Sequence, residues 1–248
     1  MTEPDKIGMI VTFTDFGSSG PYLGQMRAAL YRHAPNVPVV DLLTDAPLCN
    51  PKSSAYLLAA LVPEFEPGTV FLCVVDPGVG GARAPVAVES EGRWFVGPDN
   101  GLFELAARRR SHRAWEITWR PERLSMTFHG RDLFAPIAAR LAVGERMETL
   151  GRPTSLQPQD WPDDLAEVVY VDHYGNVMTG LRGAGVDPKD ALVISGHVIS
   201  PAERFDQVEP GQPFWYVNSC GLVEIAVNQG RADSVLCVRI GDFCGYMK

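Results

Sequence analysis

The stretch TVFLCVVDPG, residues 69–78, decides the fold. It is a short apolar run that ends in an aspartate and a glycine turn, and MIVTFTDFG at residues 9–17 repeats this pattern. Between the two, residues 22–33 carry apolar side chains at helical spacing. Short apolar strands that alternate with helices predict an α/β domain, in which a central, mostly parallel sheet is covered on both faces.

The character of the chain changes after a proline-rich segment at about residues 151–164, which indicates a linker. Before it we predict an N-terminal layered α/β domain over residues 1–155. After it, short apolar runs separated by Gly, Pro and Asn predict a C-terminal antiparallel, β-barrel-like domain over residues 165–248. Strands are expected there at residues 167–171, 177–181, 191–194, 214–217, 223–227 and 234–240. In the first domain we expect strands at 9–14, 37–42, 69–75, 86–90 and 94–96, and helices at 22–33, 53–61, 102–109 and 133–143.

Composition narrows the classes of function. The 248 residues have a formal net charge of −8 and no long basic run, so nucleic acid is a poor partner. No apolar run reaches the roughly 20 residues that span a bilayer, which argues against a membrane protein. The five cysteines are scattered without a CxxC pair. This pattern predicts no disulfide and no zinc site, mostly small core residues, and a reducing, cytoplasmic location.

Three predicted strands end in an aspartate beside a glycine turn: Asp15, Asp76 and Asp99. One such aspartate is usually a turn former or a helix cap. Three in one domain favour a shared cleft, since ligands of open α/β sheets bind beyond the carboxyl ends of the strands.

Two further side chains accompany these aspartates. Arg83 ends the glycine-rich stretch DPGVGGAR, so the loop could bring its guanidinium back to Asp76. The pair could be a structural ion pair or a cation that fixes the charge state of an active-site acid. His129 in FHGRD could be a general base or a structural donor, and Asp132 could cap the following helix.

Two polar turns of the second domain, DHYGN (172–176) and NSCG (218–221), are explained by simple hairpin chemistry. Alternatively, Tyr174 and Phe214 could stack on a base whose edge Asn176 would read.

Taken together, these motifs resemble the S-adenosylmethionine hydroxide adenosyltransferase family, which is related to the fluorinases and chlorinases. The resemblance extends in order over nearly the whole chain. It is carried by TDFG (14–17), VDPGVGGAR (75–83), VGPDNGLFE (96–104), FHGRDLFAPIAARLA (128–142), VDHYGNVMTGL (171–181) and VNSCGLVEIAVN (217–228).

The resemblance implies hydrolysis of S-adenosylmethionine to adenosine and methionine, by attack of water on the ribose 5′ carbon. It implies no metal and no cofactor besides this substrate. It also implies a homotrimer, in which the substrate lies between the N-terminal domain of one subunit and the C-terminal domain of its neighbour.

Residue by residue, the resemblance implies that Asp76, Arg83 and His129 position and activate the water. Pairing of Arg83 with Asp76 would leave the carboxylate a weak base, which slightly favours His129 as the proton acceptor.

The same resemblance implies a substrate-binding role for five more residues. Asp15 would bind the ribose hydroxyls. Asn176 would read the adenine, with Tyr174 stacking nearby. Asp172 and Ser219 would hold the amino and carboxylate groups of the methionine.

Departures from the related enzymes leave alternatives open. The halogenases resemble this chain but carry Tyr in place of Asp76, whose charge would repel a halide. Cys49 replaces an aromatic residue usual over the substrate, and Cys220 replaces the arginine that binds the carboxylate in halogenases. Besides a halogenase, we weigh a metallohydrolase and a non-catalytic S-adenosylmethionine-binding trimer. The metallohydrolase would use Asp15, Asp76, Asp99 and His129.

Overall fold

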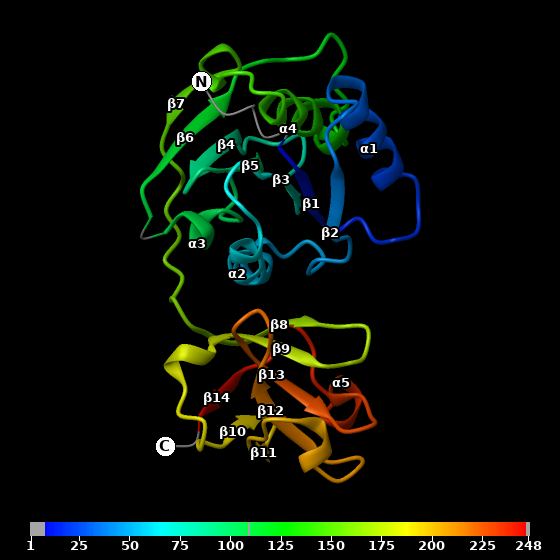
Figure 1. The fold of residues 1–248 in the computed structure, drawn as a ribbon, viewed down its shortest axis with the longest axis vertical. Coiled ribbons are helices and arrows are strands. Elements are labelled where there is room, and N and C mark those ends of the chain that lie inside the picture. Colours follow the sequence, from blue (N-terminus) through cyan, green and yellow to red (C-terminus); the bar gives the residue numbers. More distant parts are fainter. Residues whose placement is uncertain (1–7, 109, 247–248) are drawn as a thin grey trace, which may run out of the picture. The chain divides into compact units, whose positions relative to one another are not determined.

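The computed structural model describes residues 8–108 and 110–246 (Figure 1). The chain divides into two compact units, with the main boundary between Gln159 and Asp160, and residues 59–61 are grouped with the second unit. Each unit has a buried apolar core of its own.

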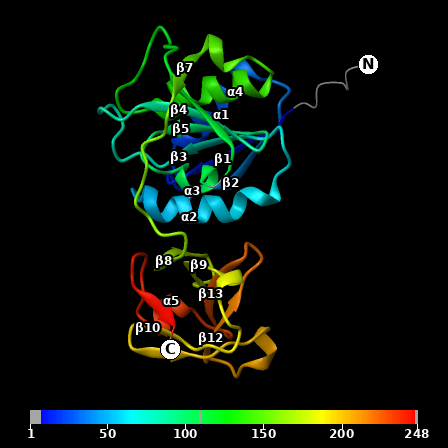
Figure 2. The same ribbon diagram turned by 90° about the vertical axis from the view of Figure 1, so that its left-hand side faces the viewer.

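The first unit is built on a seven-stranded sheet with the strand order β2-β1-β3-β5-β4-β6-β7 (Figure 2). Strands β2, β1, β3 and β5 are parallel to one another, whereas β4 pairs antiparallel with β5, and β6 and β7 follow by further antiparallel pairing. The sheet is therefore mixed, and the expectation of a mostly parallel sheet holds for only one half of it. The strands are β1 (Ile10–Thr14), β2 (Val39–Leu43), β3 (Val70–Val74), β4 (Pro85–Ser90), β5 (Arg93–Pro98), β6 (His112–Ile117) and β7 (Gly151–Thr154).

Helices cover both faces of this sheet. Helices α1 (Tyr22–His33) and α4 (Ala135–Ala142) lie on one face, and α2 (Pro51–Leu61) and α3 (Glu104–Ala107) lie on the other (Figures 1 and 2). The predicted inner face of α1 is confirmed, because Met26 and Leu30 are fully buried. Short helical turns complete the unit: η1 (Val62–Glu64), η2 (Gly130–Phe134) and η3 (Met147–Thr149).

Two expectations for the first unit are wrong. The helix expected at residues 102–109 is only the single turn α3. The first residues of the predicted linker form strand β7, which pairs with β6. Strand β6 itself was not predicted from the sequence. An edge strand tolerates Pro153 because one side of its backbone makes no ladder hydrogen bonds.

The second unit contains two antiparallel sheets, with the orders β12-β13-β9-β8 and β11-β10-β14. Isolated bridges, Glu167–Phe243 and Pro201–Trp215, join edges of the two sheets. Antiparallel sheets are confirmed, and closure into a barrel stays a prediction. The elements are β8 (Leu165–Val171), β9 (Val177–Arg182), η4 (Gly183–Gly185), β10 (Leu192–Ile194), β11 (His197–Ile199), η5 (Phe205–Gln207), β12 (Pro213–Val217), β13 (Leu222–Val227), α5 (Ala232–Val235) and β14 (Cys244–Tyr246).

The strand expected at residues 234–240 is wrong. This segment contains the end of α5, and Ala232 and Leu236 are buried four residues apart, which is a helical spacing. The last strand, β14, follows it.

None of the five cysteines, all of which lie in the described ranges, forms a disulfide. Only Cys73 and Cys244 are buried, so the expectation that most of them are core residues is wrong. No helix in the described ranges is both long and apolar enough to cross a membrane.

Candidate active site

The structure brings Asp76, Arg83 and His129 together in the first unit. Asp76 follows β3, Arg83 precedes β4, and His129 precedes the turn η2 that leads into α4. The Nε atom of Arg83 donates to Asp76 Oδ1 at 3.0 Å, and its Nη2 atom bonds the second carboxylate oxygen. The same Nη2 atom lies 2.9 Å from Nδ1 of His129. The side chains of Asp76 and Arg83 are only 4% and 11% exposed, so this is a buried network.

The loop that returns Arg83 to Asp76 depends on its glycines. Gly80 has a φ of +76°, and a Cβ atom there would collide with the carbonyl oxygen of Met126. Only glycine combines this backbone angle with so close an approach. The sequence DPGVGGAR therefore fixes where the guanidinium lies.

The bond from Arg83 fixes the tautomer of His129. A guanidinium only donates, so Nδ1 of His129 must accept, and the proton of the neutral ring must lie on Nε2. Burial lowers the pKa of His129, and the charge of Arg83 lowers it further, which favours this neutral form. The Nε2 atom is buried and has no hydrogen-bond partner within the described residues. It is thus a buried donor that the described residues leave without an acceptor.

The turn η2 supports both members of this bond. It is a π-helical turn, and Phe134 at its end lies under the guanidinium, whose carbon is 5.2 Å from the ring centroid. Such wide turns are frequent at functional sites. Asp132 does not cap α4 as expected. It pairs with Arg131 and accepts from the backbone N–H of Ser125 at 2.9 Å.

Asp15 lies beside this network because β1 and β3 are parallel neighbours. Its Oδ2 accepts from the backbone N–H of Cys49 at 2.9 Å. Burial raises the pKa of Asp15, and the charge of Asp76 adds to this rise. Cys49 holds its N–H in place with a φ of +53°, a left-handed angle that is uncommon outside glycine.

Asp99, the third strand-end aspartate, is engaged elsewhere. It accepts from the backbone N–H of Gln157 at 3.4 Å, and burial raises its pKa, with the charge of Glu104 contributing. Over residues 8–108 and 110–246, no group of three or more His, Cys, Asp or Glu side chains is arranged to hold a metal ion.

The other predicted residues line a cavity of about 770 Å³ in the second unit. Asp172, Tyr174, Asn176 and Ser219 all belong to its wall. Phe214, named from the sequence as a stacking residue, is instead 1% exposed in the interior. The wall consists of Asp172, Tyr174, Asn176, Met178, Phe205, Tyr216, Asn218, Ser219, Cys220, Glu224, Val227, Gln229 and Gly230.

Asp172 and Asn176 close the turn between β8 and β9. Asp172 Oδ1 accepts from the backbone N–H of Asn176 at 2.8 Å, and Oδ2 accepts from its side-chain amide at 3.0 Å. Tyr174 at the tip of this turn is 75% exposed, so its ring is available for stacking.

Glu224 is a cavity residue that sequence reasoning missed. It is 3% exposed, and it accepts from the hydroxyl of Tyr216 and, at 2.8 Å, from the amide of Asn218. Burial raises the pKa of Glu224, and the charge of Asp172 adds to the rise. The available signal was a charged residue inside the otherwise apolar strand LVEIAV, because a buried charge needs dedicated partners.

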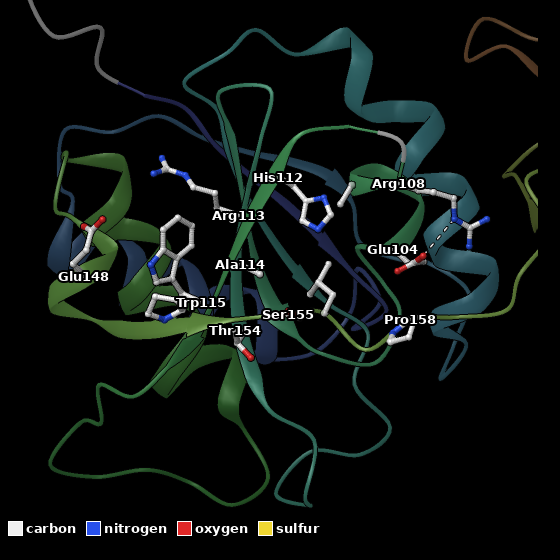
Figure 3. Close-up of a pocket in the computed structure, with 13 residues that line it drawn as sticks. Glu104, Arg108, His112, Arg113, Ala114, Trp115, Glu148, Thr154, Ser155 and Pro158 are labelled. Atoms are coloured by element: carbon white, nitrogen blue, oxygen red, sulfur yellow. Dashed lines mark hydrogen bonds and ion pairs between the residues drawn. The ribbon is translucent and has the colours of Figure 1, made fainter.

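Figure 3 shows a different pocket of the first unit, of about 650 Å³, beside β6, β7 and α3. Arg108 is paired with Glu104 at 3.3 Å, and Arg113 is paired with Glu89. The site residues predicted from the sequence are not among the described residues that line it.

Comparison with known proteins agrees with the resemblance. The SAM hydroxide adenosyltransferase N-terminal domain matches residues 10–151, and the C-terminal domain of the same name matches residues 166–244. A relative from Salinispora arenicola, named (R)-S-adenosyl-L-methionine hydrolase, is 38% identical over 92% of this chain and 94% of its own. A fluorinase from Actinopolyspora mzabensis is 27% identical over 89% of this chain and 90% of its own.

A solved structure has the same fold. It is the crystal structure of an uncharacterized conserved protein from Thermotoga maritima, with a TM-score of 0.88 and 31% identity, covering 97% of this chain and 100% of that one. The chain belongs to the S-adenosylmethionine hydroxide adenosyltransferase family.

Proposed function

We propose that the protein hydrolyses S-adenosylmethionine to adenosine and methionine. The family and the name of the relative from Salinispora arenicola support this reaction. The same name suggests that the (R) epimer at sulfur is the preferred substrate. The observation that carries the proposal is the buried Asp76–Arg83–His129 network, which leaves a donor at His129 Nε2 without a partner.

The residue types suit this chemistry. The sulfonium leaves the 5′ carbon as a neutral thioether, so the leaving group needs no acid. Water is a weak nucleophile and must be held in line, about 3 Å from the carbon, in a pocket that excludes other water. A hydrogen bond from His129 Nε2–H to the oxygen of this water would position it.

Asp76 is then the group that accepts the proton. The Nδ1 lone pair of His129 is engaged by Arg83, and Nε2 already carries a proton. This revises the sequence-based preference for His129. As the bond from oxygen to the 5′ carbon forms and the carbon–sulfur bond breaks, one water proton passes to Asp76, and adenosine is released with a neutral 5′ hydroxyl.

The remaining assignments follow from the family. Asp15 binds the ribose hydroxyls, and Asn176 and Tyr174 bind the adenine. Asp172 and Ser219 hold the amino acid end of the substrate. No metal and no further cofactor takes part.

The proposal extends to assembly and location. The protein is a homotrimer whose active sites combine the first unit of one subunit with the second unit of its neighbour. It works in the cytoplasm, without a nucleic-acid or membrane partner.

The test is incubation of the protein with each sulfonium epimer, with and without a chelator, while adenosine and methionine are measured. We expect both products, faster from the (R) epimer and unaffected by the chelator. Asp76→Asn, Arg83→Ala and His129→Ala should each slow adenosine formation by about 10²–10⁴-fold. Asp99→Asn, a matched change at another strand end, should keep near wild-type activity.

Other outcomes would select the alternatives. Loss of activity with chelator would indicate a metallohydrolase. Binding without turnover would indicate a binding protein, and a 5′-halogenated product in the presence of halide would indicate a halogenase. Full activity in all three variants would refute the assigned network.

A further inference from the structure

The charged side chains in the wall of the second unit's cavity are all acidic. Two carboxylates, Asp172 and Glu224, belong to its wall, and none of the described residues that line it is Lys, Arg or His. The two carboxylates interact, since the charge of Asp172 contributes to the raised pKa of Glu224. Arg231, whose guanidinium interacts with Asp172, is paired with Asp233 and is not part of this wall. A ligand group against the wall therefore meets negative charge from the residues that line it.

The polar donors next to these carboxylates are already engaged. The Tyr216 hydroxyl and the Asn218 side-chain amide donate to Glu224, and the Asn176 side-chain amide donates to Asp172. Each of these three groups thus directs a donor to a carboxylate of the wall itself.

The turn at residues 218–221 is also closed on itself. The side-chain oxygen of Asn218 accepts from the backbone N–H groups of Cys220 and Leu222, each at 3.0 Å, and its carbonyl oxygen accepts from Gly221 at 3.0 Å. The turn thus presents the hydroxyl of Ser219 and the thiol of Cys220, which are neutral donors.

We propose that the site does not require the amino acid carboxylate of its substrate, and that it also hydrolyses adenosyl sulfonium compounds whose side chain is an aminoalkyl group without a carboxylate. This inference rests on the proposed function. An ammonium group would be attracted to Asp172, whereas a carboxylate would face two like charges and no cation among the described residues of the wall.

The reaction balances as for the parent substrate. Water oxygen bonds to the 5′ carbon while the carbon–sulfur bond breaks and its electron pair stays on sulfur. The products are adenosine and a methylthioalkylamine, whose sulfur is now a neutral thioether and whose amino group keeps its ammonium charge, and the water proton leaves through Asp76 to solvent. No oxidant, reductant or co-reactant is needed.

The experiment compares kcat/KM for S-adenosylmethionine and for decarboxylated S-adenosylmethionine, both prepared as mixtures of the two sulfonium epimers. Adenosine is the product measured in both cases. We expect the decarboxylated compound to be hydrolysed with a kcat/KM within about tenfold of that for S-adenosylmethionine, or above it.

Two variants at one position sharpen the comparison. Cys220→Arg places a guanidinium on the turn, and should shift the preference toward the carboxylated substrate by about tenfold or more. Cys220→Ser is the matched control, because it changes the side chain without adding charge, and should shift the preference far less than Cys220→Arg.

The outcomes separate the two proposals. Rapid hydrolysis of S-adenosylmethionine, with a loss of more than about tenfold for the decarboxylated compound, would overturn this inference alone. If neither compound released adenosine, the proposed hydrolase would be overturned and this inference with it.

Discussion

Arg83 organises the proposed active site through its hydrogen bonds. Its guanidinium bonds both oxygens of Asp76 and, through Nη2, the Nδ1 atom of His129, while its face rests on Phe134. One side chain thereby determines which atoms of its two partners remain available for a water molecule. Lys could not replace it, because an ammonium lacks the planar fork of donors that reaches both partners.

The protonation of His129 provides a test of this arrangement. Replacing Arg83 by Gln removes a positive charge that lowers the pKa of His129, and leaves the charge of Asp76, which raises it. We therefore expect the pKa of His129, measured by NMR titration of its ring, to lie below 6.5 in the wild type and to rise in Arg83→Gln.

The direction of this pKa shift sets the pH range over which the bond between Arg83 and His129 persists. Because the pKa of His129 is lowered, its neutral form, and with it the bond from Arg83, persists as the pH falls below 6.5 and is lost only when the pH reaches the lowered pKa. Arg152→Gln, which removes a surface arginine paired with Glu116, is the control and should leave the titration unchanged. An unaltered pKa in Arg83→Gln would contradict control of the ring by the guanidinium.

Sequence reasoning anticipated part of this site. The seven-residue spacing of Asp76 and Arg83 within a glycine-rich loop predicts their meeting, which the structure shows. The charge within LVEIAV was a signal for Glu224, but the sequence could not reveal its partners Tyr216 and Asn218, which lie on the paired strand and its turn. Nor could it reveal the tautomer of His129, which depends on a bond between side chains 46 residues apart.

At the scale of elements, strands β3 and β5 approach each other closely beside the site, and this sets the distance between them. A Cβ atom at Gly97 in β5 would collide with the carbonyl oxygen of Cys73 in β3, and would lie 2.9 Å from the ring of Phe103. The two strands precede Asp76 and Asp99 respectively, so their separation affects how the strand ends are placed.

Gly97→Ala should therefore lower the free energy of unfolding by about 2–3 kcal/mol, because the backbone of β3 has no room to move away. The control is Gly24→Ala. Gly24 lies on the exposed side of α1 with no atom within 4 Å of an added Cβ, so alanine should stabilise the helix by about 0.5–1 kcal/mol. In urea unfolding, the midpoint should be lower than that of the wild type for Gly97→Ala and higher for Gly24→Ala. An unchanged midpoint in Gly97→Ala would refute the close packing.

The elements that sequence patterns predicted well are those with strong periodicity or wholly apolar runs, such as α1 and β3. Where prediction failed, tertiary pairing outweighed local pattern. The proline-containing β7 is a strand only because β6 offers it a partner, and the apolar residues after Asp233 pack as a helical turn rather than a strand.

At the scale of the whole molecule, the proposed trimer makes a prediction about mixed subunits. Asp76 belongs to the first unit and Asp172 to the second, so each proposed active site takes them from different chains. Asp76→Ala and Asp172→Ala should each be inactive alone. When the two variants are unfolded together and refolded as a mixture, about a quarter of the sites should contain both native residues.

Adenosine formation by the mixture is the measurement, with each variant refolded alone as the control. Light scattering should give three times the 27.1 kDa mass of the chain. Absence of any recovered activity in a mixture of that mass would mean that each chain builds its own site.

The hydrogen bonds of the second unit's cavity have one more consequence. Asp172 is hydrogen-bonded to Asn176, and Glu224 to Tyr216 and Asn218, so these parts of the wall are held in place by the protein itself. A rigid wall loses little rotamer freedom when it is occupied, and affinity is not diminished by the cost of ordering side chains. A wall of this kind selects ligands by their charge, through carboxylates whose positions are fixed beforehand, and not by closing around the ligand.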